Sequence, residues 1–336
     1  MRASPVIAGL VGLVLVQGCA GNDGLSVAAP QAVAEDGPAA RAAALARLDA
    51  RVGAVFFRLV TANLDLCPDK GRSAGWTLHA ANQYSPQLRD VLTVDGDMRG
   101  DLPTVLAVAP DGPAAMAGLV PGDVILKVGD QTMAVGTEGR PARYEGVAAN
   151  LAILDATLVS QDPVRLTVRR DGGDLDLDLR PVAACAYSVH VEPSTALSAR
   201  ADGRGVFIST ALVAFAASDD DLALILGHEL AHNVLEHREK FDREAPARSV
   251  FGNLAVAPAS LEAGERDADR TGLYLMARAG FAFEGAPAFW RAFGAANWRV
   301  RWAQWGHPTA ERRAQLLEGA VTEIQALRAE GRPILP

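Results

Sequence analysis

The sequence predicts an α+β protein in which a small β-rich segment precedes a longer, mainly helical one. Short strand-like runs separated by Gly- and Pro-rich turns fill residues 75–182. Residues 186–336 instead carry apolar residues at helical spacing, without a 34-residue repeat. At ~150 residues per domain, the length of 336 residues also predicts about two domains.

The composition is that of a folded protein with a sizeable core. Hydrophobic residues make up 49% of the chain and charged residues 21%, which is usual for a globular protein and unlike a disordered one. The 32 basic and 40 acidic residues give a formal net charge of −8. This acidic balance argues against nucleic acid as a partner.

The N-terminus is typical of an export signal. An apolar run from Pro5 to Val16 follows Arg2 and is shorter than the ~20 residues of a membrane-spanning helix. The next residues, Val16-Gln17-Gly18-Cys19, resemble a bacterial lipobox. We therefore predict a lipoprotein signal peptide over 1–18, a lipid on Cys19 and a flexible Gly/Ala/Pro-rich tether over 19–38. The alternative is a cleaved signal that leaves Cys19 unmodified.

The signal predicts a periplasmic location. Ala20 follows Cys19, where an aspartate is associated with retention in the inner membrane, so we expect a lipid anchor in the inner leaflet of the outer membrane.

Cys67 and Cys185 are then an even pair in an oxidising compartment. This predicts a disulfide between them, the alternative being two buried thiols.

Residues 39–70 are expected to contain an amphipathic helix. Its apolar stripe recurs at spacings of three and four: Leu45, Leu48, Val52, Val55, Phe56, Leu59 and Ala62. Pro68 ends the pattern. Such a stripe needs a partner, for which we expect the C-terminal domain.

Residues 75–182 resemble a PDZ domain. The resemblance rests on the segment from Ala109 through Gly118 to Gly122-Asp123, which leads from a strand through a short helix to a Gly-Asp turn. It implies a groove, beside a helix over 145–159, that binds an extended peptide by strand addition. Gly75-Trp76-Thr77-Leu78 departs from the usual Gly-Leu-Gly-Phe carboxylate loop. A β domain that serves only as a spacer is the alternative.

The strongest chemical signal is His228-Glu229-Leu230-Ala231-His232. Ser218 and Asp221 form a capping-box pattern ahead of it, which predicts a helix through the motif. Residues four apart share a helix face, so both imidazoles can reach one zinc ion while Glu229 faces the metal-bound water. A catalytic zinc needs a third protein ligand and an open fourth position.

Glu265 is the better candidate for the third ligand. On a continuous helix His237 would lie about 140° around from His232, so we interpret it as a packing or polar surface residue. Glu265 and Asp269 lie four apart at the start of another helical run. Such a pair suits a ligand and a carboxylate that orients a histidine.

The combined motifs resemble the HtpX and CAAX prenyl protease family of zinc metallopeptidases, of the gluzincin type. They are His228 to His232, Glu265 to Asp269, and His307-Pro308 followed by Arg313. With the PDZ-like segment, the chain is similar to bacterial lipoprotein-type members. The resemblance implies a zincin-like domain over 186–336, with one Zn²⁺ held by His228, His232 and Glu265, Glu229 as general base and Asp269 in support.

The resemblance places His307 and Arg313 near the cleft as further catalytic candidates. His307 would cap the zinc or stabilise the oxyanion, and Arg313 would hold the loop. A His-Pro turn that starts the last helix is the alternative. The stretch 241–264 is either a lid or a plain loop.

The predicted function is hydrolysis of peptide bonds in unfolded or misassembled envelope proteins by a zinc endopeptidase. The hydrophobic membrane segments of HtpX-type members are absent after residue 202. The strand expected within 201–209 resembles the family's cleft strand, to which an extended substrate could add. Four tryptophans over 290–305 favour helix packing over a substrate shelf. The alternative function is a PDZ-bearing chaperone or adaptor with a closed or structural zinc site.

Overall fold

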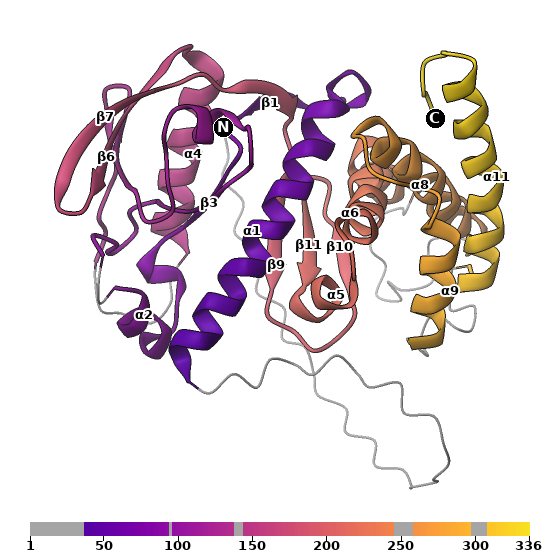
Figure 1. The fold of residues 1–336 in the computed structure, drawn as a ribbon, viewed down its shortest axis with the longest axis horizontal. Coiled ribbons are helices and arrows are strands. Elements are labelled where there is room, and N and C mark those ends of the chain that lie inside the picture. The colour runs from indigo at the N-terminus through magenta and orange to yellow at the C-terminus, as the bar shows by residue number, and fades with distance from the viewer. Residues whose placement is uncertain (1–36, 94–95, 138–143, 245–257, 297–307) are drawn as a thin grey trace, which may run out of the picture.

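The computed structural model describes residues 37–93, 96–137, 144–244, 258–296 and 308–336. A long helix, α1 (Pro38–Ala62), separates two parts of the molecule: a β-rich part on the left and a mainly helical part on the right (Figure 1). The predicted α+β class, with a small β domain ahead of a helical region, is confirmed.

The β-rich part is a sheet of order β2-β3-β4-β6-β7, with β5 paired to β4. Its strands are β2 (Trp76–His79), β3 (Thr104–Val108), β4 (Val124–Val128), β5 (Gln131–Thr132), β6 (Val164–Arg170) and β7 (Gly173–Leu179). Its helices are η2 (Ala81–Gln83), α2 (Pro86–Leu92), α3 (Pro113–Met116) and α4 (Glu145–Ser160). The helix expected over 145–159 is therefore α4.

Turn chemistry sets the register of the last hairpin of this sheet. Asp171 and Gly172 both have positive φ, 51° and 77°, as the favoured two-residue hairpin turns require. The turn pairs Arg170 with Gly173, and the ladder continues to Val164 and Leu179. The β-rich part also has its own hydrophobic core around Ile125, Leu154 and Leu166.

The helical part combines a small sheet with a set of packed helices. The sheet has the order β10-β11-β9, with β9 (Ser188–Glu192), β10 (Ala199–Ala201) and β11 (Gly205–Ser209). The helices are α5 (Thr210–Phe215), α6 (Asp219–Val234), α7 (His237–Glu244), α8 (Pro258–Arg278), α9 (Ala286–Ala296) and α11 (Ala310–Ala329). The stretch 201–209, expected to form the edge strand along the cleft, is mostly β11, which lies in the centre of this sheet. That placement was wrong by one strand, because the neighbouring β10 forms the edge.

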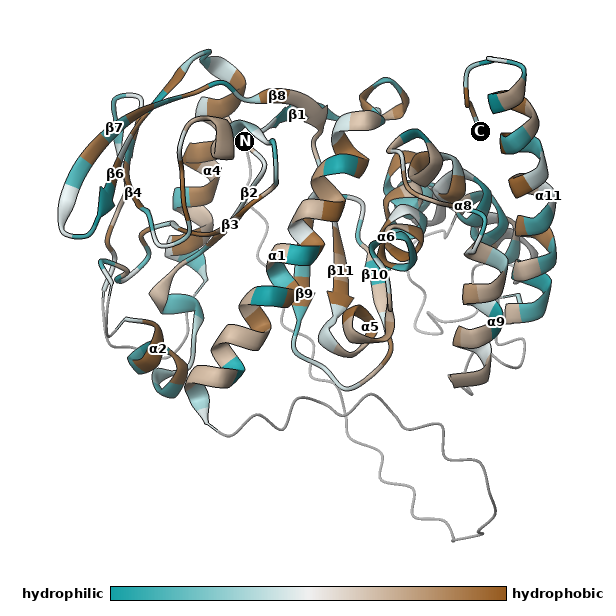
Figure 2. Ribbon diagram, in the orientation of Figure 1, coloured by the Kyte–Doolittle hydropathy of each residue, from teal (hydrophilic) through white to brown (hydrophobic). Residues whose placement is uncertain are grey.

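Helix α1 contacts both parts of the molecule. Figure 2 shows apolar residues recurring along it, and Val52, Val55, Phe56 and Leu59 are buried in the core of the helical part, each stabilising the fold by about 1.5–3 kcal/mol. Another side of α1 meets the β-rich part, where a Cβ at Gly75 would lie 3.2 Å from the Phe57 ring. We expected α1 to pack on the C-terminal domain, but it packs on the β-rich part as well.

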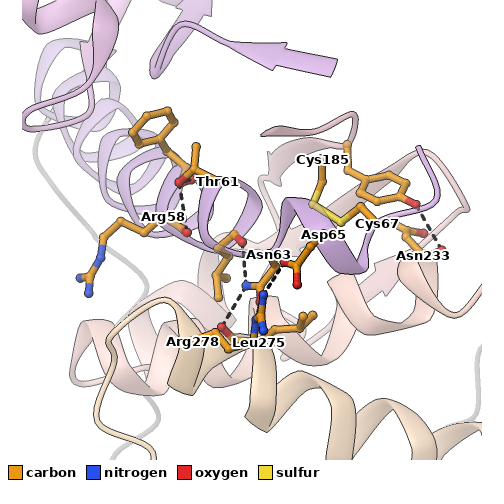
Figure 3. Close-up of a disulfide and its surroundings, with 12 residues drawn as sticks. Arg58, Thr61, Asn63, Asp65, Cys67, Cys185, Asn233, Leu275 and Arg278 are labelled. Atoms are coloured by element: carbon orange, nitrogen blue, oxygen red, sulfur yellow. Dashed lines mark hydrogen bonds and ion pairs between the residues drawn. A yellow bond between two sulfur atoms is a disulfide. The ribbon is translucent and has the colours of Figure 1, made fainter. Parts of the chain in front are cut away.

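A disulfide joins the two segments through which the chain enters and leaves the β-rich part. Cys67 and Cys185 are bonded to each other (Figure 3). Beside them, β1 (Lys70–Ser73) pairs antiparallel with β8 (Val182–Cys185). Asn63, just before the short helix η1 (Leu64–Leu66), donates to the carbonyls of Leu59 and Leu275. The segments that enter and leave the β-rich part are thereby held together near α8.

Helix α8 begins at Pro258, seven residues before Glu265, so Glu265 lies inside a helix and does not open it. Within the described residues, no helix combines the length and apolarity needed to cross a bilayer.

Candidate metal centre

Helix α6 carries the His228–His232 motif and begins with the predicted cap. The Ser218 side chain accepts a hydrogen bond from the Asp221 amide, and the Asp221 carboxylate accepts one from the Ser218 amide. This box satisfies amides that a helix start leaves unpaired. Leu222, Leu226 and Leu230 are fully buried. The motif is therefore fixed on a helix held in the core.

Helix α8 crosses α6 at two glycines. A Cβ added at Gly227 would lie 2.8 Å from the Gly272 carbonyl oxygen, and one added at Gly272 would lie 2.7 Å from the His228 amide nitrogen. Only the missing side chains allow backbones to approach so closely. The crossing brings Glu265 and Asp269 of α8 beside His228 and His232.

The three predicted ligands have the spacing of a zinc site. Donor atoms of His228, His232 and Glu265 all lie within 4.8 Å of one another. The two Nε2 atoms are 3.2 Å apart, and the Glu265 carboxylate oxygens lie 3.5 Å from His228 and 3.6 Å from His232. Ligands at 2.0–2.1 Å around a tetrahedral ion lie about 3.4 Å apart. The donor set thus fits one Zn²⁺.

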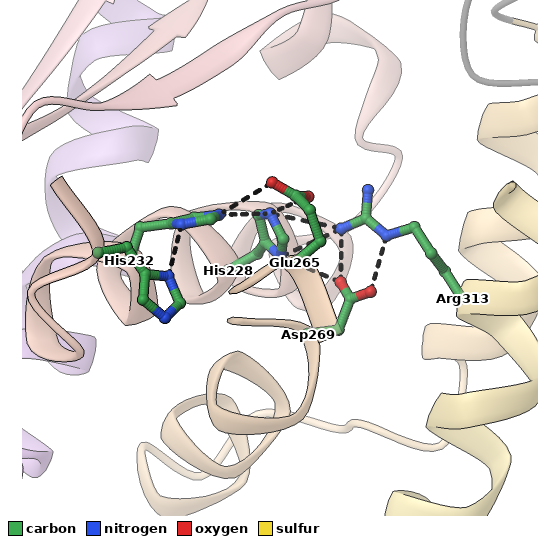
Figure 4. Close-up of polar contacts among 6 residues, drawn as sticks. His228, His232, Glu265, Asp269 and Arg313 are labelled. Atoms are coloured by element: carbon green, nitrogen blue, oxygen red, sulfur yellow. Dashed lines mark hydrogen bonds and ion pairs between the residues drawn. The ribbon is translucent and has the colours of Figure 1, made fainter. Parts of the chain in front are cut away.

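Asp269 and Arg313 support His228 from behind (Figure 4). His228 Nδ1 lies 3.0 Å from Asp269 Oδ1, so an Nδ1–H donated to the carboxylate leaves Nε2 for a metal. Arg313, from α11, donates its Nε–H to Asp269 Oδ2 at 2.8 Å and is itself buried. The carboxylate of Asp269 therefore links the arginine to the histidine.

Burial and neighbouring charges shift the pKa values of these groups in different directions. Burial and the Arg313 charge lower the pKa of His228, but its contacts with Asp269 and Glu265 outweigh them and raise it to about 9. Burial raises the pKa of Asp269, but Arg313 and His228 hold it below its usual value. Burial and the His228 charge lower the pKa of His232 to about 3. Metal binding requires neutral imidazoles beside an anionic carboxylate. His232 is already neutral, whereas zinc would have to displace the extra proton that His228 holds in the metal-free protein.

The interpretation of His237 as a packing or surface residue was incomplete, because α6 does not continue to it. The helix ends at Val234 and Glu236 has a φ of 53°. This left-handed residue turns the chain and places His237 Nδ1 2.9 Å from His232 Nδ1. His237 is 6% exposed. It contacts Nδ1 of His232, whereas Nε2 of His232 faces Glu265.

Asn233 connects the cleft strand to the metal helix, a role that nothing in the sequence signalled. Its Oδ1 accepts a hydrogen bond from the Gly203 amide at 2.8 Å, and its Nδ2 donates to the Gly205 carbonyl at 3.1 Å. Gly203 lies in the turn between β10 and β11, and Gly205 is the first residue of β11. The side chain next to His232 thus holds the edge strand along the cleft.

A cavity of about 480 Å³ opens beside the three metal-binding candidates, and Glu229 also lines it. Trp290 forms part of its wall and packs against Arg313, whose guanidinium carbon lies 3.4 Å from the ring centroid. The Trp290 indole N–H is buried without a hydrogen-bond partner among the described residues. Trp290 therefore belongs to the site and not only to helix packing.

Some predicted residues lie outside the described part of the chain. These are Cys19, His307 and the tryptophans at 298, 302 and 305. The centre of the suggested lid, 245–257, is also outside it, whereas helices α7 and α8 occupy the ends of that stretch.

Two family profiles match the chain, at positions that agree with this geometry. Residues 104–142 match the PDZ domain and residues 187–243 match Peptidase family M48. A search of curated proteins finds no match.

Solved structures show partial similarity to the chain. The HtrA3 PDZ domain bound to a phage-derived ligand (FGRWV) is 25% identical over 34% of this chain and 88% of that chain, with a TM-score of 0.25. The HtrA-type protease AlgW with decapeptide is 23% identical over 34% of this chain and 30% of that chain, with a TM-score of 0.24.

Family M48 consists of zinc-dependent metallopeptidases, and its match includes both histidines of the candidate centre. The chain thus combines a match to a PDZ domain with a match to a family of zinc metallopeptidases.

Proposed function

We propose that the protein is a zinc endopeptidase of the gluzincin type that hydrolyses peptide bonds in unfolded or misassembled envelope proteins. The observation that carries this proposal is the tetrahedral spacing of His228, His232 and Glu265 next to a cavity that Glu229 also lines. A structural zinc site has no use for the extra carboxylate of Glu229 or for an open cavity. The resemblance to HtpX-type enzymes supports the same conclusion.

Bound zinc would supply a Lewis acid that polarises the substrate carbonyl and lowers the pKa of a water molecule to ~7. Glu229 takes the proton from the attacking water as the new C–O bond forms. It then returns this proton to the leaving amine as the C–N bond breaks.

Asp269 and Arg313 are positioning residues in this scheme. Asp269 holds the His228 ring through its Nδ1 side, and Arg313 keeps Asp269 charged. For His307 we propose the role of stabilising the oxyanion, since a permanent cap on the metal would close the site. We also propose that Cys19 carries the lipid that anchors the enzyme in the periplasm, at the inner leaflet of the outer membrane.

Two surfaces would receive protein substrates. The outer edge of β10 borders the cavity and can accept an extended chain by strand addition. The PDZ match supports a second peptide groove, next to α4, that delivers chain ends.

The test is cleavage of casein by the zinc-incubated full chain and by Glu229→Gln. We expect the variant to retain zinc and to lose at least ~100-fold of the cleavage rate, because it lacks the general base. Glu330→Gln, at the exposed end of α11, is the control for loss of a carboxylate and should cleave normally. If neither the wild type nor the variant cleaves despite bound zinc, the peptidase proposal is wrong and the chaperone function is favoured.

A further inference from the structure

One wall of the cavity beside the metal cluster is built from aliphatic and aromatic side chains. They are Leu197, Leu212, Ile225, Phe289, Trp290 and Phe293. The cavity of about 480 Å³ lies against this wall. A side chain that enters the cleft on this side therefore meets apolar surface.

The aromatic part of this wall is preformed. Phe289 and Phe293 lie one turn apart on α9, with ring centroids 6.1 Å apart and planes within 11°. Phe215, from α5, meets them edge to face at 5.9 Å and 5.7 Å. Each such contact contributes about 0.5–1.5 kcal/mol beyond burial, so the wall is fixed before any ligand arrives and binding requires little reordering.

The apolar wall begins directly at the metal cluster. Ile225 precedes His228 by three residues on α6, and the Trp290 ring centroid lies 6.1 Å from that of His228. Beyond His232 the lining becomes polar, with Asn233 and Arg238. Along α6, the cleft therefore changes from apolar to polar across the position where a bond would be cut.

The edge strand fixes how a substrate would lie against this wall. The Ser198 carbonyl accepts from the Ser209 amide, and the Asp202 amide donates to the Gly205 carbonyl. In an antiparallel ladder these alternate pairs leave Ala199 and Ala201 with their backbone groups on the outer edge. A chain added there directs alternate side chains to opposite sides, so one side chain beside the scissile bond faces the apolar wall.

We infer that the cleft selects a large apolar side chain, best an aromatic one, immediately beside the bond that is cut. This inference rests on the proposed peptidase function. One methylene group more or less in an apolar pocket changes discrimination by about 10- to 200-fold, and phenylalanine differs from alanine by more than that. A charged side chain would lose its hydration without gaining a partner on this wall. We therefore expect at least tenfold selection of phenylalanine over alanine, and stronger rejection of aspartate.

The first experiment maps the bonds that the full chain cleaves in urea-denatured casein, by mass spectrometry. Phenylalanine, leucine or tryptophan should be enriched at one position next to the cleaved bond. An even distribution, or enrichment of glycine or acidic residues, would overturn the inference while leaving the peptidase function intact.

The second experiment separates selectivity from catalysis. Zinc-incubated Glu229→Gln is titrated with fluorescent decapeptides that differ only in a central Phe, Ala or Asp. We expect Kd to rise at least tenfold from Phe to Ala, even if the wild type cleaves nothing. Equal Kd values would contradict the inference whatever the outcome for catalysis.

A matched pair of variants then assigns the selectivity to the wall. Phe293→Leu in the Glu229→Gln background should reduce the preference for Phe over Ala at least threefold. Phe281→Leu makes the same change at a residue that is also buried and lies outside the cavity lining, so it should leave the ratio unaltered. Identical Phe-over-Ala ratios of Kd in the two variants would show that α9 does not contribute to substrate selectivity.

Discussion

His237 contacts His232 because the chain turns sharply at Glu236 between them. The contact joins the two Nδ1 atoms at 2.9 Å and so fixes the ring that directs Nε2 at the Glu265 carboxylate. Groups that hold a metal-binding histidine by its second nitrogen set its tautomer and orientation. A positioning role for His237 follows, in place of a ligand role.

Replacement of His237 by alanine should weaken zinc binding about 10- to 100-fold, the usual effect of removing such a partner. The affinity is measured by competition with a fluorescent chelator. His190→Ala removes a histidine that stacks on Phe207 in the small sheet and should leave the affinity as in the wild type. Equal zinc affinity for His237→Ala and wild type would show that the contact is incidental.

The sequence predicts the candidate metal ligands better than the residues that hold those ligands in position. The His228 to His232 spacing, the Ser218 cap and the Glu265–Asp269 pair follow from local helical periodicity, which is legible in one chain. The contacts of Asn233 and Trp290 depend on residues distant in the sequence, and that of His237 on one left-handed residue. No local pattern encodes these.

The crossing of α6 and α8 brings the parts of the candidate metal centre together. Gly227 and Gly272 allow the two backbones to touch, and each helix carries part of the donor set. The sequence predicts both helices but gives no crossing point, because a helical glycine is equally compatible with mere surface exposure. The start of α8 at Pro258 was missed for a related reason, since its first turns lack the apolar spacing that marked the later ones.

Gly272→Ala should push the helices apart. We expect a loss of about 1–3 kcal/mol in stability, as for other overpacked cores, together with weaker zinc binding because Glu265 moves from the histidines. Gly319→Ala on α11, where a Cβ meets nothing within 4 Å, is the control and should be neutral or slightly stabilising. Thermal melts with and without zinc measure both terms. A Gly272→Ala protein that melts and binds zinc like Gly319→Ala would refute the close-crossing explanation.

Across the whole molecule, α1 and the disulfide join the two parts. The sequence predicted the helix, the β-rich segment and the pairing of Cys67 with Cys185, because apolar spacing and cysteine count are readable directly. It did not show that α1 packs on both parts at once. Contact with the β-rich part depends on Phe57 and Gly75 meeting in three dimensions, and the sequence predicted no such pairing.

The junction between α1 and the β-rich part contains a partly buried carboxylate. Burial raises the pKa of Asp49 to about 6, and its charge helps to raise the pKa of Tyr84. The folded state then binds a proton more tightly than the unfolded state, whose pKa is near 3.8. The stability linked to Asp49 is therefore present below pH ~4 and is lost as pH rises through ~6.

Asp49→Asn should accordingly gain stability relative to the wild type as the pH rises. We expect little difference in melting temperature at pH 4 and an advantage of ~1–2 kcal/mol for the variant at pH 7.5, reduced by solvent screening of the carboxylate. Asp130→Asn, an exposed residue between β4 and β5, should give no such pH-dependent difference. A constant offset between Asp49→Asn and the wild type across this range would contradict the assignment.

The central claim is that His228, His232 and Glu265 form an open zinc site. X-ray absorption at the zinc edge, on the zinc-loaded full chain, counts the ligands directly. We predict two imidazole nitrogens, one carboxylate and one light, non-protein oxygen ligand, with zinc at one equivalent per chain. A third imidazole in place of that oxygen, or no zinc bound at all, would contradict an open catalytic site.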